Sequence, residues 1–243
     1  MNLKLTLEYD GTDFCGWQEQ MGQRSVQGTV AEALARLTGQ NIKLHGAGRT
    51  DAGVHALGQV ANCVVKTQIP PEKFAKALNP LLPPDVKVLT SEVVAEEWHA
   101  RFSARGKLYS YHLLLSDRPR PLLRHRALRV GASFDLDKVE QAISLFLGRH
   151  DFAPFSAKGS SVKSTVRTIT QAELLRQGEH CQLLFAADGF LYHMVRMMVG
   201  ELVAVALGSV TPEEVAATLA TAERRRPPLT APPQGLYLVE VRY

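Results

Sequence analysis

One short stretch, residues 46–56, combines residue types that can carry out chemistry. It contains three glycines, Arg49 and the carboxylate Asp51, and it lies between two apolar runs. Because glycine has no side chain, a bulky, planar substrate can lie against the backbone on either side of this carboxylate. Arg49 lies two positions before Asp51 and favours the ionised form of its carboxyl group. The stretch therefore predicts a reaction centre.

Two other interpretations of this stretch are less favoured. Glycine beside aspartate is also ordinary turn chemistry, but a hairpin turn needs only about two to five residues, and this stretch is longer. A phosphate-binding loop requires a helix directly after its glycines. Residues 58–65 have the β-branched content of a strand instead.

Two histidines close to the aspartate raise the question of a metal. His45 and His55 flank Asp51 in the sequence. Their spacing fits no single helical face, so a metal-dependent phosphoesterase remains only a minor alternative and we expect no metal.

The composition limits the class of protein. With 243 residues, of which 45% are hydrophobic, the chain can bury a substantial core without disulfides. Its cysteines are far apart and have no paired spacing, which suggests a reducing compartment; they are Cys15, Cys63 and Cys181. The N-terminus alternates leucine with polar residues, which is typical of a strand and not of a signal peptide. We therefore expect a cytoplasmic protein without a membrane segment.

The charge distribution suggests a polyanionic partner. The net charge is only +4, but the isoelectric point is near 9.0 and the arginines are clustered. Residues 118–129 contain five arginines beside His125 in a proline-broken loop, and Arg224, Arg225 and Arg226 form a second cluster. Each cluster by itself is typical of a solvated surface, but two of them in a balanced chain favour nucleic acid.

The hydrophobic periodicity predicts a β-α-β-β-α-β order for the first half of the chain. The expected strands cover residues 3–9, 42–46, 58–65 and 86–89. Ser25 is expected to cap the first helix, and Pro71 is expected to start the second. This order is typical of a ferredoxin-like, RNA-recognition-type unit, whose antiparallel sheet carries its helices on one face.

The second half repeats this theme loosely. We expect strands at residues 108–115 and 127–130, a helix up to residue 146, and a hairpin of residues 165–175 and 182–187. A long helix from residue 191 follows, then a helix with a capping box at Thr211, and finally a strand at residues 236–241. The segment 116–126 is the one candidate linker.

The motifs taken together resemble those of the tRNA pseudouridine synthases, in particular the branch that modifies the anticodon stem-loop. The resemblance spans nearly the whole chain. The matching motifs are Tyr9–Thr12 (YDGT), Gly16–Gln18 (GWQ), residues 48–56 (GRTDAGVHA), residues 99–104 (HARFSA), Tyr109 with Tyr111, Gly148 with residues 150–152 (HDF), residues 193–196 (HMVR), and Ala231-Pro232 with Gly235-Leu236.

The resemblance implies a reaction and its catalytic residue. Enzymes of this family break the bond between ribose C1′ and uracil N1, turn the base, and join C1′ to C5. Such an isomerisation needs no cofactor, which agrees with the lack of a Walker, zincin or dinucleotide motif in the sequence. Asp51 aligns with the family's catalytic aspartate, as a nucleophile or as a base.

Three further residues align with family positions that contact the substrate. Tyr109 aligns with the active-site tyrosine, although its alternation with Tyr111 and Leu113 also fits a strand aromatic in the core. Arg196 aligns with the basic partner of the carboxylate, although its place on the helix alone would favour solvent. Arg49 aligns with the residue near the stack that the flipped uridine leaves, with a phosphate contact as the alternative.

Three residues depart from the family pattern. Trp98 and Lys107 replace a phenylalanine and an arginine, and Met197 follows Arg196 where asparagine is common. Met197 puts in doubt a polar network around Arg196, and Lys107 weakens a bidentate phosphate contact.

We therefore expect an α/β protein with a central antiparallel sheet made of two ferredoxin-like halves, with a catalytic cleft between them. Residues 1–105 form the half with the aspartate loop, and residues 106–243 form the half with Tyr109 and Arg196. The resemblance implies a homodimer that acts on uridines 38, 39 and 40 of tRNA. A non-catalytic RNA-binding module remains the alternative.

Overall fold

The computed structural model describes residues 1–131, 133–157, 159, 162–224 and 226–243. The chain forms two compact units, one of Met1–Arg105 with Tyr237–Tyr243, the other of Gly106–Leu236. Two expectations need correction. The last strand belongs to the first unit and not to the C-terminal half, and the candidate linker 116–126 lies inside the second unit.

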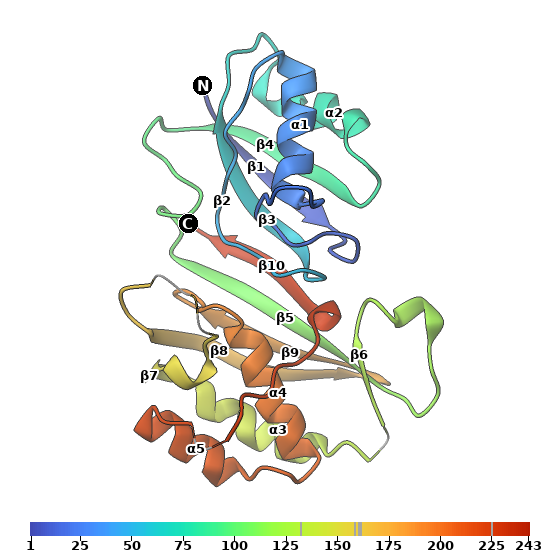
Figure 1. Ribbon diagram of the computed structural model, residues 1–243, viewed down its shortest axis with the longest axis vertical. Coiled ribbons are helices and arrows are strands. Elements are labelled where there is room, and N and C mark those ends of the chain that lie inside the picture. The colour runs from blue at the N-terminus through green and yellow to red at the C-terminus, as the bar shows by residue number, and fades with distance from the viewer. Residues whose placement is uncertain (132, 158, 160–161, 225) are drawn as a thin grey trace. The chain divides into compact units, whose positions relative to one another are not determined.

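The first unit is a mostly antiparallel sheet with two helices (Figure 1). Its elements are β1 (Asn2–Tyr9), α1 (Val26–Thr38), β2 (His45–Gly46), β3 (His55–Val64), α2 (Pro71–Leu78), β4 (Val86–Val94) and β10 (Leu236–Arg242), of which Leu236 belongs to the other unit. The sheet has the order β4-β1-β3, and β2 pairs antiparallel with β3. Strand β10 runs parallel to β3, with Tyr237 opposite His55. The β-α-β-β-α-β order predicted for residues 1–94 is confirmed, although β2 is shorter than expected.

Local sequence signals explain these elements. Strand β1 directs Leu3, Leu5 and Leu7 to one face, and all three are fully buried. The hydroxyl of Ser25 accepts the N–H of Gly28 and caps α1, as expected. Helix α1 buries its apolar stripe, which makes one hydrophobic layer with the leucines of β1.

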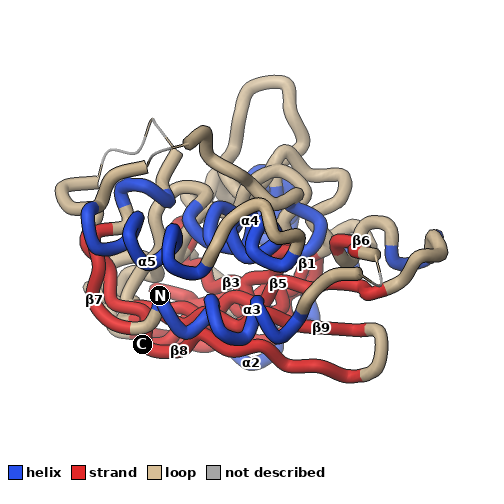
Figure 2. Tube along the Cα trace, turned by 90° about the horizontal axis from the view of Figure 1, so that it is seen from below, coloured by secondary structure: helices blue, strands red, loops and turns tan. Residues whose placement is uncertain are grey.

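The second unit combines mostly antiparallel strands with helices (Figure 2). Its elements are β5 (Gly106–Leu115), β6 (Leu128–Val130), α3 (Leu136–Ile143), β7 (Gly148–Asp151), β8 (Val166–Gln177), β9 (His180–Ala187), α4 (Met194–Ala206) and α5 (Pro212–Thr221). The strand order is β5-β9-β8-β7, and β6 runs parallel beside β5. Strand β7 was not predicted, because its four residues show no alternation.

Helix α3 packs against both α4 and α5. It also contacts strand β8, and α5 contacts strand β7. Thr211 and Glu214 form the predicted capping box of α5. Helix α4 is buried over nearly all of its surface, which explains its long apolar run. None of the helices in the described ranges is long and apolar enough to cross a membrane.

Candidate active site

The loop that carries Asp51 is held by backbone hydrogen bonds to the segment after β1. The N–H of Trp17 donates to the carbonyl of Thr50 at 3.0 Å, and Gly16 forms an isolated antiparallel bridge with Asp51. At the start of the loop, the N–H of Ala47 donates to Val60 at 2.7 Å. After the aspartate, the N–H of Gly53 donates to the carbonyl of Phe14 at 3.4 Å, so bonds on both sides of Asp51 fix the backbone that presents its carboxylate.

Two glycines allow this close approach. Gly16 has a φ of +111°, and a β-carbon there would lie 2.6 Å from the carbonyl oxygen of Thr50. A β-carbon at Gly46 would lie 2.4 Å from the indole of Trp17, which is buried. Both positions therefore require glycine, because any side chain would push the aspartate loop away from the segment that anchors it.

A buried network of polar side chains supports the aspartate loop. The hydroxyls of Tyr9 and Thr50 lie 2.8 Å apart, and the amide of Gln59 donates to the carbonyl of Gly48 at 3.0 Å and to Tyr9 at 3.4 Å. Burial raises the pKa of Tyr9 to about 12, although its bonds to Thr50 and Gln59 lower the pKa. This phenol therefore stays protonated at neutral pH and acts as a fixed support for residues beside Asp51.

The two expected site residues of this unit differ in exposure. Asp51 is half-buried, whereas Arg49 is exposed. Thr50, between them, points into the core and is only 6% exposed. Alternation along the loop thus places the arginine and the aspartate on the accessible side and anchors the residue between them.

Tyr109 lies on β5 of the other unit. It pairs with Phe185 on β9, is 7% exposed, and contacts the ring of Phe190 edge-on at 5.1 Å. Tyr111 and Leu113 on the same face are fully buried, as the alternation predicted. Tyr109 is thus held by aromatic packing.

Arg196 is placed near the start of α4 and is half-buried. Its Nε donates to the carbonyl of Ala231 at 2.9 Å, and its own carbonyl accepts the N–H of Ala231 at the same distance. The segment before β10 therefore fixes this guanidinium. Met197, which replaces a common asparagine, is buried in the core.

Arg196 also has a buried phenol near it. Burial raises the pKa of Tyr111, while the positive charge of Arg196 lowers it. The Tyr111 hydroxyl donates to the carbonyl of Pro232 at 2.8 Å, and a β-carbon at Gly235 would lie 2.7 Å from its ring. Tyr111, Arg196 and the segment 231–235 thus form one packed group within the second unit.

The sequence did not reveal that several residues support the site through hydrogen bonds. Tyr9, Gln59, Tyr111 and Pro232 are hydrogen-bonded supports, yet sequence reasoning gave them no role. Gln59 in the middle of an apolar strand was the one available signal, since a buried amide needs partners.

The two histidines near the aspartate are separated in the structure. His55 is buried in β3, accepts the N–H of Gly11 at its Nδ1, and stacks on Tyr237 at 4.7 Å. His45 is half-buried on β2 and contacts the ring of His99. Within the described ranges, no group of three or more histidine, cysteine or carboxylate residues is arranged to hold a metal.

The two arginine clusters have different environments. The arginines at positions 118, 120 and 124 in the loop before β6 are exposed, and so is Arg129 within β6. In the second cluster, Arg224 and Arg226 both bond to the buried carboxylate of Glu201 on α4. These two arginines therefore neutralise an internal carboxylate, a role in the fold that the sequence did not indicate. Arg225 lies outside the described residues.

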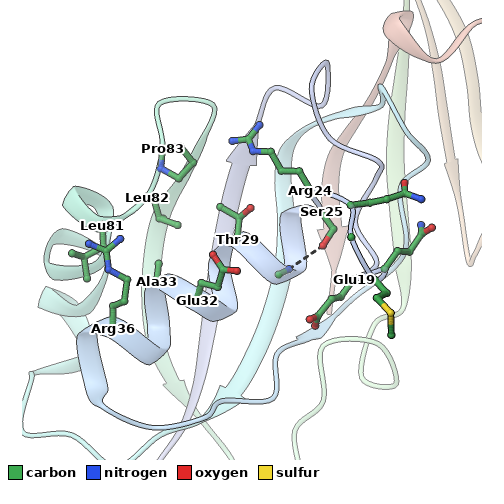
Figure 3. Close-up of a pocket in the computed structure, with 15 residues that line it drawn as sticks. Glu19, Arg24, Ser25, Thr29, Glu32, Ala33, Arg36, Leu81, Leu82 and Pro83 are labelled. Atoms are coloured by element: carbon green, nitrogen blue, oxygen red, sulfur yellow. Dashed lines mark hydrogen bonds between the residues drawn. The ribbon is translucent and has the colours of Figure 1, made fainter.

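One cavity of the structure does not involve the aspartate loop. It has a volume of about 780 Å³ and lies between the start of α1, the segment 19–25 and residues 81–83 (Figure 3). None of the expected site residues lines it, and Arg24 at its edge is already paired with both carboxylate oxygens of Asp85. Its other charged residues are of both signs, so it has no clear preference for an anion.

A carboxylate can act as the nucleophile in covalent catalysis, and Asp51 is presented on a glycine-framed loop of an α/β fold. The family model described as tRNA pseudouridine synthase matches residues 6–103 and 142–243. The chain belongs to the tRNA pseudouridine synthase family, which confirms the resemblance of the motifs.

Two relatives match over the full chain. The tRNA pseudouridine synthase A of Acetivibrio thermocellus is 46% identical over 242 residues, which cover 100% of this chain and 99% of the relative. The tRNA pseudouridine synthase A 2 of Clostridium perfringens is 40% identical with the same coverage. Among solved structures, the archaeal box H/ACA sRNP Nop10–Cbf5 complex matches 83% of this chain and 43% of its own, at 12% identity and a TM-score of 0.37. That likeness is too weak for a comparison of sites.

Proposed function

We propose that this chain converts uridine to pseudouridine at positions 38, 39 and 40 of the tRNA anticodon stem-loop, with Asp51 as the catalytic nucleophile. Membership of the family supports the reaction. The assignment to Asp51 is supported by the position of its carboxylate. This carboxylate is half-buried on a loop whose backbone is anchored on both sides.

The proposed reaction balances without any added reactant. A carboxylate oxygen of Asp51 attacks either the sugar C1′ or the ring C6, the C1′–N1 bond breaks, and the uracil turns. A bond from C1′ to C5 then forms, the bond to Asp51 breaks, C5 loses its proton to solvent, and N1 takes one up. Substrate and product are isomers, so the step consumes no electrons and no nucleotide.

We assign three residues to substrate binding in this reaction. A uridine inside an RNA stem must leave the stack, at a cost of a few kcal/mol. The exposed guanidinium of Arg49 is suited to take the place of the lost base. The resemblance of the motifs assigns the Tyr109 ring, held edge-on by Phe190, to the uracil, and it assigns Arg196 to the role of keeping the attacking carboxylate ionised.

A homodimer in the cytoplasm is part of the same proposal. It is supported by the resemblance of the motifs, which implies that each tRNA contacts both subunits. The absence of paired cysteine spacing agrees with a reducing compartment.

The decisive experiment replaces Asp51 by asparagine. We expect Asp51→Asn to bind unmodified tRNA as the wild type does, but to release no tritium from tRNA labelled at uridine C5. Asp13→Asn is the matched control, because Asp13 is an exposed carboxylate of the same unit. Undiminished tritium release by Asp51→Asn would rule out Asp51 as the nucleophile.

The same assay separates the alternatives. A wild-type protein that binds tRNA but releases no tritium is a non-catalytic RNA-binding module. A nuclease or phosphatase activity that chelator abolishes and a divalent ion restores would indicate the metal-dependent phosphoesterase instead.

A further inference from the structure

Three aromatic rings of the first unit contact one another in sequence at tilted angles, and we call this group the aromatic stack: His45, His99 and Phe102. The rings of His45 and His99 lie 4.8 Å apart, and those of His99 and Phe102 lie 4.5 Å apart, with interplanar angles of 49° and 37°. His45 belongs to β2, whereas the other two residues belong to the segment between β4 and β5. The stack therefore begins on the sheet and ends at the surface.

The outer ring of this stack is in solvent. Phe102 is 77% exposed, although a large aromatic side chain gains most when it is buried. A single exposed apolar residue needs no explanation, but this ring is supported by two others. An exposed ring on a fixed base is the arrangement of a docking platform.

Hydrogen bonds fix the backbone that carries the outer ring. The N–H of Ser103 donates to the carbonyl of His99 at 2.9 Å, and the Ser103 hydroxyl accepts the N–H of His99. The N–H of Ala100 donates to the buried Asn62 at 2.9 Å, and its carbonyl accepts the hydroxyl of Tyr243. The segment is thus ordered before any ligand arrives, which lowers the entropy cost of binding.

The charged groups that act on the stack are basic. The guanidinium of Arg101 lies 5.7 Å from the centre of the Phe102 ring. The pKa of His45 is lowered by burial, by His99 and by the charge of Lys43, so this lysine also acts on the stack. Both cations are exposed, as are the acidic residues at positions 96 and 97, which precede Trp98. An aromatic ring between basic groups suits a nucleobase with its phosphates.

We propose that the exposed face of Phe102 stacks on an unpaired base of the tRNA anticodon loop, outside the reacting position, while Lys43 and Arg101 bind the neighbouring phosphates. This inference rests on the proposed function for the identity of the RNA. Asp51 follows His45 by six residues, so the two α-carbons are at most about 22 Å apart. The aromatic stack is therefore within a few nucleotides of the aspartate loop.

The test compares variants of Phe102 in the full chain with an unmodified tRNA transcript as the probe. Stacking of one base is worth about 1 to 3 kcal/mol, so Phe102→Ala should weaken tRNA binding about 5- to 150-fold. Phe102→Trp should restore the affinity, whereas Phe102→Leu should not, because it keeps an apolar group but no ring. Tritium release at saturating tRNA should stay within about twofold of the wild type, since the ring does not touch the reacting base.

Val64→Ala serves as the control, because Val64 is an apolar residue of the same unit that is 67% exposed. The proposal is overturned if Phe102→Ala or Phe102→Leu binds tRNA as the wild type does, or if the wild type binds no tRNA. It is also overturned if Phe102→Ala leaves the tRNA affinity unchanged but lowers the molar mass measured by sedimentation. The surface around Phe102 would then be an interface between copies of the chain. A wild type that binds tRNA without making pseudouridine refutes the proposed function, and the variants' affinities still decide the role of Phe102.

Discussion

Asp51 depends on residues that lie far from it in the sequence. Its neighbour Thr50 is bound by Tyr9, forty-one residues away, and by the backbone of Trp17. Sequence reasoning found the aspartate from the glycines around it, since their chemistry is local. It did not find Tyr9, because a tyrosine in an alternating strand fits the core equally well.

Tyr9→Phe tests this support. The change removes the hydrogen bond to Thr50 and should lower the free energy of unfolding by about 1 kcal/mol. It should also lower kcat on the order of tenfold, because a small displacement of the loop misplaces the carboxylate. Ser91→Ala is the control, since it removes hydrogen bonds to Ala75 and Pro71 in the same unit but away from the loop. Equal kcat values for both variants would contradict a role of Tyr9 in positioning the aspartate.

The same variant carries a pH signature. The folded protein holds the Tyr9 proton up to a pKa of about 12, whereas the unfolded chain loses it near 10.0. This contribution to stability is therefore complete below pH 10 and is lost as the pH rises from 10 to 12. Denaturant unfolding across this range should show a smaller fall for Tyr9→Phe than for the wild type. An identical fall would show that Tyr9 is not buried as a phenol.

Helix α4 links the core of the second unit to Arg196. Its periodicity predicted a helix, but the sequence could not show what lies over Gly200. The segment 229–231 crosses there, and a β-carbon at Gly200 would lie 2.5 Å from the carbonyl oxygen of Leu229. This close crossing brings Ala231 to the guanidinium of Arg196. The glycine is therefore a packing requirement.

Gly200→Ala should be destabilising for this reason. Overpacking against a backbone costs about 1 to 3 kcal/mol, which outweighs the gain of up to about 1 kcal/mol in helix propensity. Gly28→Ala in α1 is the matched control, because its β-carbon would meet side-chain atoms and no backbone: the Ser25 hydroxyl at 3.0 Å and the Glu19 side chain at 3.7 Å. Thermal melting followed by circular dichroism should show a lower Tm for Gly200→Ala alone. A raised Tm for both variants would contradict the close crossing of the segment 229–231 over Gly200.

At the scale of the whole molecule, the two arginine clusters differ in how far their positive charge is exposed to a polyanion. Two arginine clusters are equivalent in the sequence, but only the loop at residues 118–129 keeps exposed arginines without a buried carboxylate partner among the described residues. Glu201 is 3% exposed and binds Arg224 and Arg226 inside the second unit. A buried carboxylate requires such partners, so these charges serve the fold.

Salt dependence of tRNA binding should distinguish the clusters. Each phosphate contact contributes about 0.7 to 0.9 to the slope of log affinity against log salt. Replacing Arg118 and Arg124 by glutamine should therefore reduce the slope by up to about 1.8. Arg226→Gln should leave the slope unchanged but lower the Tm, because it removes a partner of Glu201. A reduced slope for Arg226→Gln, or an unchanged one for the loop variant, would reverse this assignment.

The sequence by itself determined the family, the aspartate loop, and most helices and strands, because caps, glycines and hydrophobic periodicity act over a few residues. Ser25 and Thr211 cap their helices as expected, since each hydroxyl reaches only to the next turn. Tertiary structure alone decided the contacts between distant segments. The return of β10 to the first unit, the bond of Tyr9 to Thr50, and the two arginines on Glu201 join residues that no local pattern connects. Such contacts depend on which buried polar groups and strand edges meet once the core has formed, and that is a property of the whole fold.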